Sequence, residues 1–454
     1  MNMNNRELTF EYRDEFKRKE IAGKIARLLT DDEFSPMVLD GDWGVGKTEF
    51  CHKLVNLIKS EQNKEYEEII NIPKCQCLYI DAFAEDHGDD PLLMLLGNIA
   101  HFIKNNDGNN DTAVRYQRLR NACIAVAKSC FKIGGKAAIG WLLRQRGDEI
   151  EEELLEAMKK STEEGLSALV DVSFQQYEEA KSNLEKLKVI LEEIASENER
   201  LIVIVDELDR CRPNFSVDLL EKIKHVFNVC NVSFLLVANM RQLEASISHV
   251  YGDGIDVSRY VDKFIKLIVT LPMCFDRDTF VVRVYLYELM KRGKMPGIFK
   301  GISLTFVTYL LESNSHSLRD VEHFARYAKV LERYLLNKWQ YSEYEVEQVL
   351  AVISIYLCCF SRDVVRKINI DNINVDLIFN SLNFPACSNK GKMWYNICHI
   401  IESLDTTINQ ETGVGNRGFV VDKEYIFDET HAHSFKSIQR IFIDYIMNLS
   451  LVRA

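Results

Sequence analysis

Glycine, lysine and threonine stand in the stretch LDGDWGVGKTEF, residues 39–50, at the spacing of a phosphate-binding loop. Gly41, Gly46, Lys47 and Thr48 fit the pattern G-x-x-x-x-G-K-[ST], in which backbone N–H groups surround the phosphates of a nucleotide. The Lys47 ammonium is expected to reach the β- and γ-phosphates, and the Thr48 hydroxyl is expected to ligate Mg²⁺. We therefore predict a nucleotide-binding loop made of Gly41, Asp42, Trp43, Gly44, Val45, Gly46, Lys47, Thr48 and Glu49.

Two adjacent carboxylates follow an apolar run in LIVIVDELDRC, residues 201–211. The run predicts a strand buried on both faces, and Asp206 follows at its carboxyl end, where ligands bind in open α/β sheets. We expect Asp206 to hold Mg²⁺ and Glu207 to orient and deprotonate a water molecule, which favours hydrolysis over transfer to a second substrate. The pair taken alone is also consistent with a solvated strand end.

A polar residue also ends the apolar stretch VSFLLVAN, residues 232–239. Asn239 could hold the attacking water against the γ-phosphate, as polar residues at this place do in many ATPases. An ordinary turn at the end of a strand is an equally good interpretation, because asparagine is favoured in turns.

These side chains need a sheet to position them, and the chain offers five strands for it. They are the apolar run before the loop, residues 37–39, and the segments 77–83, 201–205, 232–239 and 264–271. Helix-length segments separate them, which predicts an α/β fold with a parallel five-stranded sheet and helices on both faces.

The sequence resembles the KAP family of P-loop NTPases, within the division that carries an added strand and a catalytic acid. The resemblance runs from about residue 13 to 330. It rests on the following segments: DGDWGVGKTEF, YIDAFAEDHGDDPLLMLL, VIVDELDRCRPNFSVDLLEKIKHVFN and RYVDKFIKLIVTLP. Three positions depart from the family's usual residues: Glu207 stands for Asp, Phe83 for Trp and Asn239 for Asp.

The resemblance implies an ATPase that uses ATP and Mg²⁺ as a regulated machine, usually bacterial and often encoded beside anti-phage or plasmid-exclusion functions. Its partners would be other proteins of a defence complex, with a homo-oligomer as a further expectation. Related ATPases complete their site with an arginine from a neighbouring subunit or from a helical lid. By this analogy Arg259 and Arg319 are the main candidates, and Arg210 and Arg212 are further ones.

At 454 residues the chain is too long for one hydrophobic core. We expect an NTPase core over 1–272 with a helical insertion at about 100–198, a helical lid over 273–345 and an α-rich domain over 346–454. Nuclease, protease and nucleotide-cyclase motifs are not recognisable in the sequence, so the output of the ATPase is expected to pass to a partner.

The insertion contains a basic segment, residues 115–146, followed by an acidic stretch. Lys128, Lys132 and Lys136 disfavour a membrane span, because a lysine near the bilayer centre costs about 2.5 to 3.5 kcal/mol. The segment fits an amphipathic helix on an anionic membrane or a docking helix for a partner. It also fits pairing with the acidic stretch or binding to a nucleic-acid backbone.

The composition limits the remaining functions. A net charge of −12 disfavours a nucleic-acid translocase. The twelve cysteines lack C-x-x-C spacing and are expected to be reduced thiols. His431 and His433 lack a third metal ligand nearby in the sequence. A polar N-terminus without the apolar core of a signal peptide predicts a cytoplasmic protein, or one at the inner-membrane surface.

Overall fold

The computed structural model describes most of the chain and divides it into two compact units. The described residues are 8–61, 72–86, 91–106, 200–224, 229–274, 280–296, 299–334, 345–368, 373–384, 392–406 and 435–451, with a few positions between 188 and 195. The first unit comprises Met1–Asp42 and Gly46–Pro272, and the second comprises Trp43–Val45 and Met273–Ala454.

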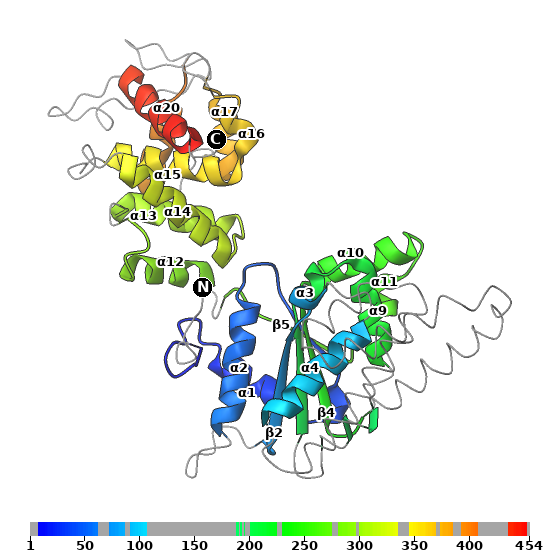
Figure 1. Ribbon diagram of the computed structural model, residues 1–454. Coiled ribbons are helices and arrows are strands. Elements are labelled where there is room, and N and C mark those ends of the chain that lie inside the picture. Colours follow the sequence, from blue (N-terminus) through cyan, green and yellow to red (C-terminus); the bar gives the residue numbers. More distant parts are fainter. Residues whose placement is uncertain are drawn as a thin grey trace, which may run out of the picture. The chain divides into compact units, whose positions relative to one another are not determined.

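A parallel five-stranded sheet forms the centre of the first unit, which confirms the predicted fold class (Figure 1). The strands are β1 (Met37–Asp40), β2 (Cys75–Asp81), β3 (Arg200–Asp206), β4 (Val232–Ala238) and β5 (Leu267–Thr270). Their order across the sheet is β2-β3-β4-β1-β5. Asp81 pairs with Asp206 and Asp40 pairs with Ala238, so the carboxyl ends of β1 to β4 lie along one edge of the sheet.

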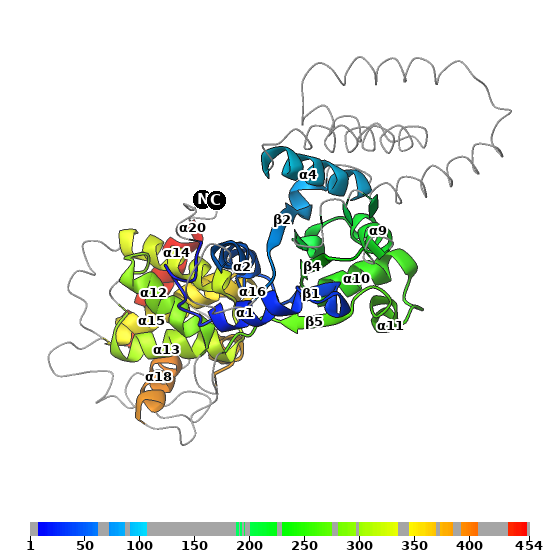
Figure 2. The ribbon, with the colours of Figure 1, turned by 90° about the horizontal axis from the view of Figure 1, so that it is seen from below.

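Helices cover both faces of this sheet, as Figures 1 and 2 show. Val203 and Val205 of β3 pack into a hydrophobic cluster with α4 (Pro91–Asn106), α9 (Pro213–Lys224) and α10 (Met240–Tyr251). Ile202 and Ile204 alternate with them and point to the other face, which α1 (Lys19–Leu28) and α2 (Lys47–Glu61) cover. Full burial of each such side chain contributes about 1.5–3 kcal/mol, which explains why these runs are apolar throughout.

Two strands differ from their predicted bounds. β2 begins at Cys75 and ends at Asp81, whose side chain accepts the backbone N–H of Ala84 and caps the short helix α3 (Ala82–Glu85). Phe83 therefore lies in a helix and is half exposed. β5 starts three residues later than predicted, because Phe264 and Ile265 pack into the hydrophobic cluster before the strand begins.

The second unit is helical in its described part. Its helices are α12 (Val281–Lys291), α13 (Gly301–Ser313), α14 (Leu318–Tyr334), α15 (Glu345–Phe360), α16 (Arg362–Val365), α17 (Val375–Leu382), α18 (Lys392–Glu402) and α20 (Phe435–Leu451). Residues of α12, α13, α14, α15, α17, α18 and α20 share one hydrophobic cluster. The central helix of this cluster is α15, in which every residue from Val349 to Cys359 is buried.

Several expectations concern residues outside the described part, namely the basic segment 115–146, His431 and His433. None of the described helices is long and apolar enough to cross a membrane. Of the described cysteines, eight are free thiols, but Cys398 is disulfide-bonded. The expectation that all cysteines are reduced is therefore wrong for Cys398.

Candidate nucleotide site

The predicted phosphate loop joins β1 to α2. Gly44 and Gly46 have φ angles of 81° and 88°, in the left-handed region that residues other than glycine rarely adopt. These two glycines let the backbone turn sharply before Lys47 starts α2. The loop therefore ends at a helix N-terminus, where free N–H groups and the helix dipole favour a bound anion.

Lys47 is the cation of this loop. Its ammonium donates hydrogen bonds to the backbone oxygens of Gly41 and Asp42. Burial lowers the pKa of Lys47, while the negative charges of Asp209 and Asp206 act in the opposite direction. Lys47 therefore lies within electrostatic reach of Asp206, at the end of β3, and of Asp209, which follows that strand.

Asp206 is the last residue of β3, and only 1% of it is exposed. The backbone N–H of Glu207 donates to its Oδ1 at 2.7 Å, and the Tyr79 hydroxyl donates to its Oδ2 at 2.8 Å. A buried carboxylate with both oxygens hydrogen-bonded has a fixed orientation. The sequence did not predict the contribution of Tyr79, which lies 127 positions away in the chain.

Glu207 occupies a strained turn directly after β3. It has φ 58° and ψ 29°, in the left-handed region, and it precedes the 3-10 helix η3 (Leu208–Arg210). A residue other than glycine held in this region costs about 1–3 kcal/mol, and such strain is concentrated at functional sites. Its Oε2 accepts from Arg210 Nη1 at 2.7 Å. Burial raises the pKa of Glu207, and Arg210 counteracts that rise.

Asn239 joins the ends of two neighbouring strands. Its side-chain oxygen accepts from the Arg241 N–H at 3.1 Å and caps α10, while its amide donates to Asp42 Oδ1 at 3.3 Å. Asp40 at the end of β1 accepts from the Met240 N–H at 2.9 Å. Asn239 thus has the predicted turn role and also contacts the phosphate loop.

A model of the KAP family P-loop domain matches residues 18–335, which is well over half of the chain. The chain belongs to the KAP family of P-loop NTPases. No curated protein matches the sequence. Family membership establishes a P-loop NTPase domain, and the site residues above come from the geometry of this chain.

The solved structures that are similar to this KAP protein share little sequence identity with it. The ORC2 protein of Aeropyrum pernix, in ADPNP–ADP complexes, is 12% identical with a TM-score of 0.34, and the match covers 96% of this chain and 95% of that one. Cdc6p from Pyrobaculum aerophilum is 10% identical with a TM-score of 0.37, covering 98% of both chains. The A. pernix ORC1 protein in complex with DNA is 14% identical with a TM-score of 0.35, covering 88% and 86%. Similarity at this level supports no conclusion about the activity of the KAP protein.

Glu49, predicted to contact the nucleotide, has its side chain in ion pairs with Arg13 and with Lys53, the latter at 2.9 Å. Lys53 also donates to the backbone oxygen of Arg13 at 2.8 Å, and Asn56 donates to that of Leu8 at 2.7 Å. An N-terminal segment, residues 8–18, is thus fixed along α2. The sequence carried no periodic signal for this contact.

The candidate arginines lie in different places. Arg259 belongs to α11 (Val257–Val261), has a side chain that is 86% exposed and pairs with Asp256 at 3.2 Å. Arg212 makes two hydrogen bonds to Asp86 and so links the residues after β3 to the end of α3. Arg319 belongs to the second unit and is exposed on α14. Within the first unit, therefore, Arg210 is the candidate arginine seen to contact Glu207.

The chemistry of the residues fits a nucleotide and Mg²⁺. The loop offers backbone N–H groups and the Lys47 ammonium to phosphate oxygens. Thr48 and Asp206 offer oxygen ligands, which Mg²⁺ prefers, and the orientation of Asp206 is already fixed. Among the described residues, no group of three or more His, Cys, Asp or Glu side chains could hold a metal by itself. Magnesium held by Thr48 and Asp206 would also take phosphate oxygens of the nucleotide as ligands.

Proposed function

We propose that this KAP protein binds Mg-ATP through Gly41–Thr48 and hydrolyses it. The observation that supports the proposal is that Lys47 lies within electrostatic reach of Asp206, whose two oxygens are already hydrogen-bonded and which the candidate base Glu207 directly follows. Bound Mg²⁺ would neutralise charge on the phosphates. Lys47 would bind the terminal phosphates, Thr48 and Asp206 would hold the metal, and Glu207 would take a proton from the attacking water. In this scheme Asn239 holds that water.

The test separates binding from hydrolysis. Lys47→Ala is expected to abolish nucleotide binding measured by calorimetry, because it removes the positive side chain of the loop. Glu207→Gln is expected to keep binding and to slow hydrolysis by about 10²-fold or more, because it removes a general base while leaving Asp206 in place. Asp262→Asn, on the surface of the same unit, serves as a matched control. Binding that survives Lys47→Ala would exclude the loop, and wild-type turnover in Glu207→Gln would exclude the base.

We further propose that the nucleotide state acts as a switch for partner proteins in a bacterial anti-phage defence complex. Support comes from the family resemblance and from a sequence in which effector motifs are not recognisable. Contacts to the γ-phosphate exist before hydrolysis and vanish afterwards, which gives a basis for two states. Arg259 or Arg319 would complete the site, in a neighbouring subunit of a homo-oligomer or from the helical lid. Phage protection by the intact operon should disappear with Glu207→Gln at unchanged protein levels.

A membrane-surface scaffold that binds ATP with little hydrolysis is the second candidate. The basic segment 115–146 favours it, because clustered lysines attract anionic lipids. Full phage protection by both Lys47→Ala and Glu207→Gln would support the scaffold over the switch.

A further inference from the structure

Tyr79 connects the edge strand of the sheet to the candidate metal ligand. It lies in β2, opposite Ile204 in the pairing register, so its side chain shares the α2 face of the sheet with Asp206. Its hydroxyl crosses to the neighbouring strand and donates to Asp206 Oδ2 at 2.8 Å. The other oxygen, Oδ1, accepts from the backbone N–H of Glu207 at 2.7 Å.

Two donors on opposite oxygens hold Asp206 without occupying all of its lone pairs. Each carboxylate oxygen can accept about two hydrogen bonds or metal contacts, so one position on each oxygen remains after these bonds. The Glu207 N–H is fixed by the backbone turn, whereas the hydroxyl depends on the Tyr79 side chain. A tyrosine hydroxyl keeps its proton at neutral pH, because its ordinary pKa is about 10, and so it acts here as a donor.

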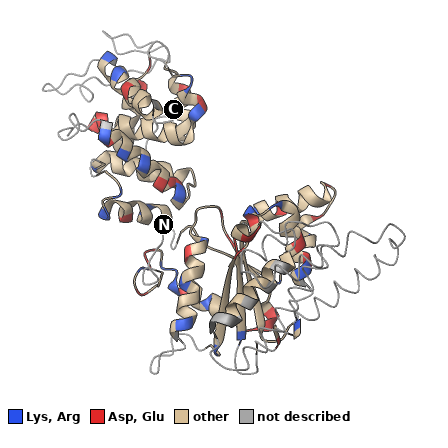
Figure 3. Ribbon diagram, viewed as in Figure 1, with Lys and Arg blue, Asp and Glu red and all other residues tan. Residues whose placement is uncertain are grey.

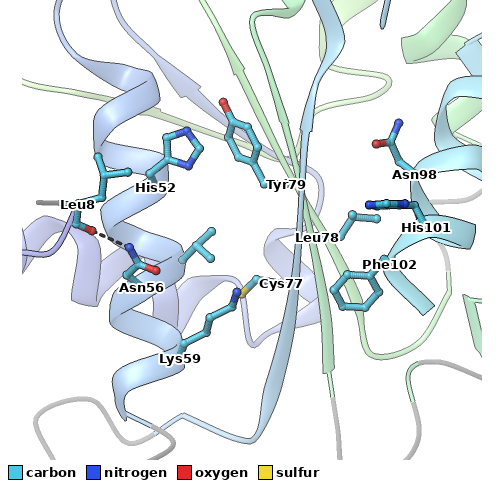
Figure 4. Close-up of a pocket in the computed structure, with 11 residues that line it drawn as sticks. Leu8, His52, Asn56, Lys59, Cys77, Leu78, Tyr79, Asn98, His101 and Phe102 are labelled. Atoms are coloured by element: carbon cyan, nitrogen blue, oxygen red, sulfur yellow. Dashed lines mark hydrogen bonds between the residues drawn. The ribbon is translucent and has the colours of Figure 1, made fainter. Parts of the chain in front are cut away.

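The ring of Tyr79 contacts the ring of His52 and lines a pocket together with it. The His52 ring of α2 lies 4.4 Å away between centroids. Both rings line a pocket of about 350 Å³. Figure 4 shows them there with Asn56, Lys59 and Phe102, which also line the pocket. The hydrogen bond to Asp206 and the contact with His52 both help to position the Tyr79 hydroxyl.

We propose that Tyr79 is a positioning residue for magnesium, which acts by holding the Asp206 carboxylate in the orientation that binds the metal. The inference rests on the proposed nucleotide site and extends it to a residue outside the two motifs. Partners that orient a metal ligand typically affect metal affinity by about 10- to 100-fold. Loss of the Tyr79 hydroxyl should therefore weaken the contribution of Mg²⁺ to nucleotide binding and leave the contribution of the loop unchanged.

The test compares Tyr79→Phe with the wild type in the full chain. A fluorescent, non-hydrolysable ATP analogue is titrated in EDTA and at fixed Mg²⁺ concentrations, so the readout does not require hydrolysis. We expect Tyr79→Phe to bind the analogue as the wild type does in EDTA, and to lose about 10-fold or more of the affinity gained from Mg²⁺. Tyr260→Phe is the matched control, since Tyr260 also donates its hydroxyl to a carboxylate, Glu221, in the same unit. This control should retain both affinities.

A second variant keeps the test informative if Tyr79→Phe folds poorly. His52→Leu keeps the Tyr79 hydroxyl but removes the ring that helps to position it. This variant should therefore lose part of the affinity for the analogue that Mg²⁺ adds. A full Mg²⁺ gain in Tyr79→Phe, or equal losses with and without Mg²⁺, would overturn the proposal. Binding that persists in Lys47→Ala would instead show that the phosphate loop is not the nucleotide site, which is a separate failure.

Discussion

Glu207 has a fixed partner in this structure, because Arg210 holds its Oε2 at 2.7 Å. Such a pair has two opposite consequences for a general base. The arginine counteracts the rise in the pKa of Glu207 that burial causes, and so keeps the carboxylate ionised to lower pH. It also restrains the side chain that must approach the water. The ability of Glu207 to act as a base therefore depends on Arg210.

Arg210→Ala is expected to change the pH profile of hydrolysis. Without the arginine the pKa of Glu207 rises further, because burial is then less opposed, and the carboxylate takes up its proton at a higher pH. Hydrolysis requires the ionised form, so the acid side of the kcat profile should shift to higher pH while the alkaline rate is retained. Steady-state rates across pH measure this shift.

Arg212→Ala is the control for this prediction, since Arg212 pairs with Asp86 instead of Glu207. It should leave the acid side of the profile where the wild type has it. A loss of rate at every pH in Arg210→Ala, without a shift, would contradict the effect on the base. That result would indicate that Arg210 acts on the nucleotide, as one of the arginine candidates.

At the scale of elements, the site depends on how strands end and helices begin. Asn239 caps α10 and contacts Asp42 of the loop, so a simple deletion of its side chain mixes two effects. Serine is as good an N-cap as asparagine, but its shorter side chain cannot extend to Asp42. Replacing Asn239 by serine therefore separates its role as a helix cap from its contact with Asp42.

Asn239→Ser is expected to fold normally and to hydrolyse slowly. Its unfolding free energy should change by only a few tenths of a kcal/mol, because the cap is kept. Hydrolysis should fall by about 10²-fold or more if Asn239 supplies a donor to the reacting groups. Chemical denaturation and turnover measure the two effects. Asn239→Ala, which loses the cap at a cost of about 1 kcal/mol, is the comparison. Wild-type turnover in the serine variant would leave Asn239 with the structural role alone.

At the scale of the whole molecule, hydrophobic packing is divided between the two units, whereas charged residues of both signs occur on both. Each unit has its own large hydrophobic cluster, so the helical unit does not depend on the sheet for its core. Figure 3 shows acidic and basic residues interspersed along the helices of both units. The chain carries a net charge of −12, which disfavours general binding to anionic surfaces. Attachment to such a surface would need a local basic segment.

The basic segment 115–146, outside the described residues, supplies the prediction at this scale. Replacing Lys128, Lys132 and Lys136 by Glu should leave nucleotide binding intact and weaken sedimentation with anionic vesicles, with a larger difference at low salt. Each lysine near a membrane surface contributes about 1 kcal/mol, so the three together affect the partition strongly. Vesicle binding equal to that of the wild type would rule out a membrane role for these lysines. Loss of nucleotide binding would indicate that the segment packs on the core.

The sequence by itself determined the class of site and the type of fold. The phosphate loop is a contiguous stretch in which Gly46, Lys47 and Thr48 are neighbours, so spacing alone identifies it. The inner strands β1, β3 and β4 are apolar runs buried on both faces, which composition also reveals. The end of such a run is equally visible in the sequence, and it places Asp206 at the end of a strand.

Only the tertiary structure decided which distant residues meet. The strand order places β2 beside β3, and so brings Tyr79 to a carboxylate 127 positions away. Glu49 pairs with Lys53 of its own helix and also with Arg13, which comes from a segment without periodic apolar residues. Contacts of this kind arise when side chains from separate elements pack together. Spacing and periodicity in the sequence describe one helix or strand at a time. They therefore do not predict which polar groups pair across the sheet.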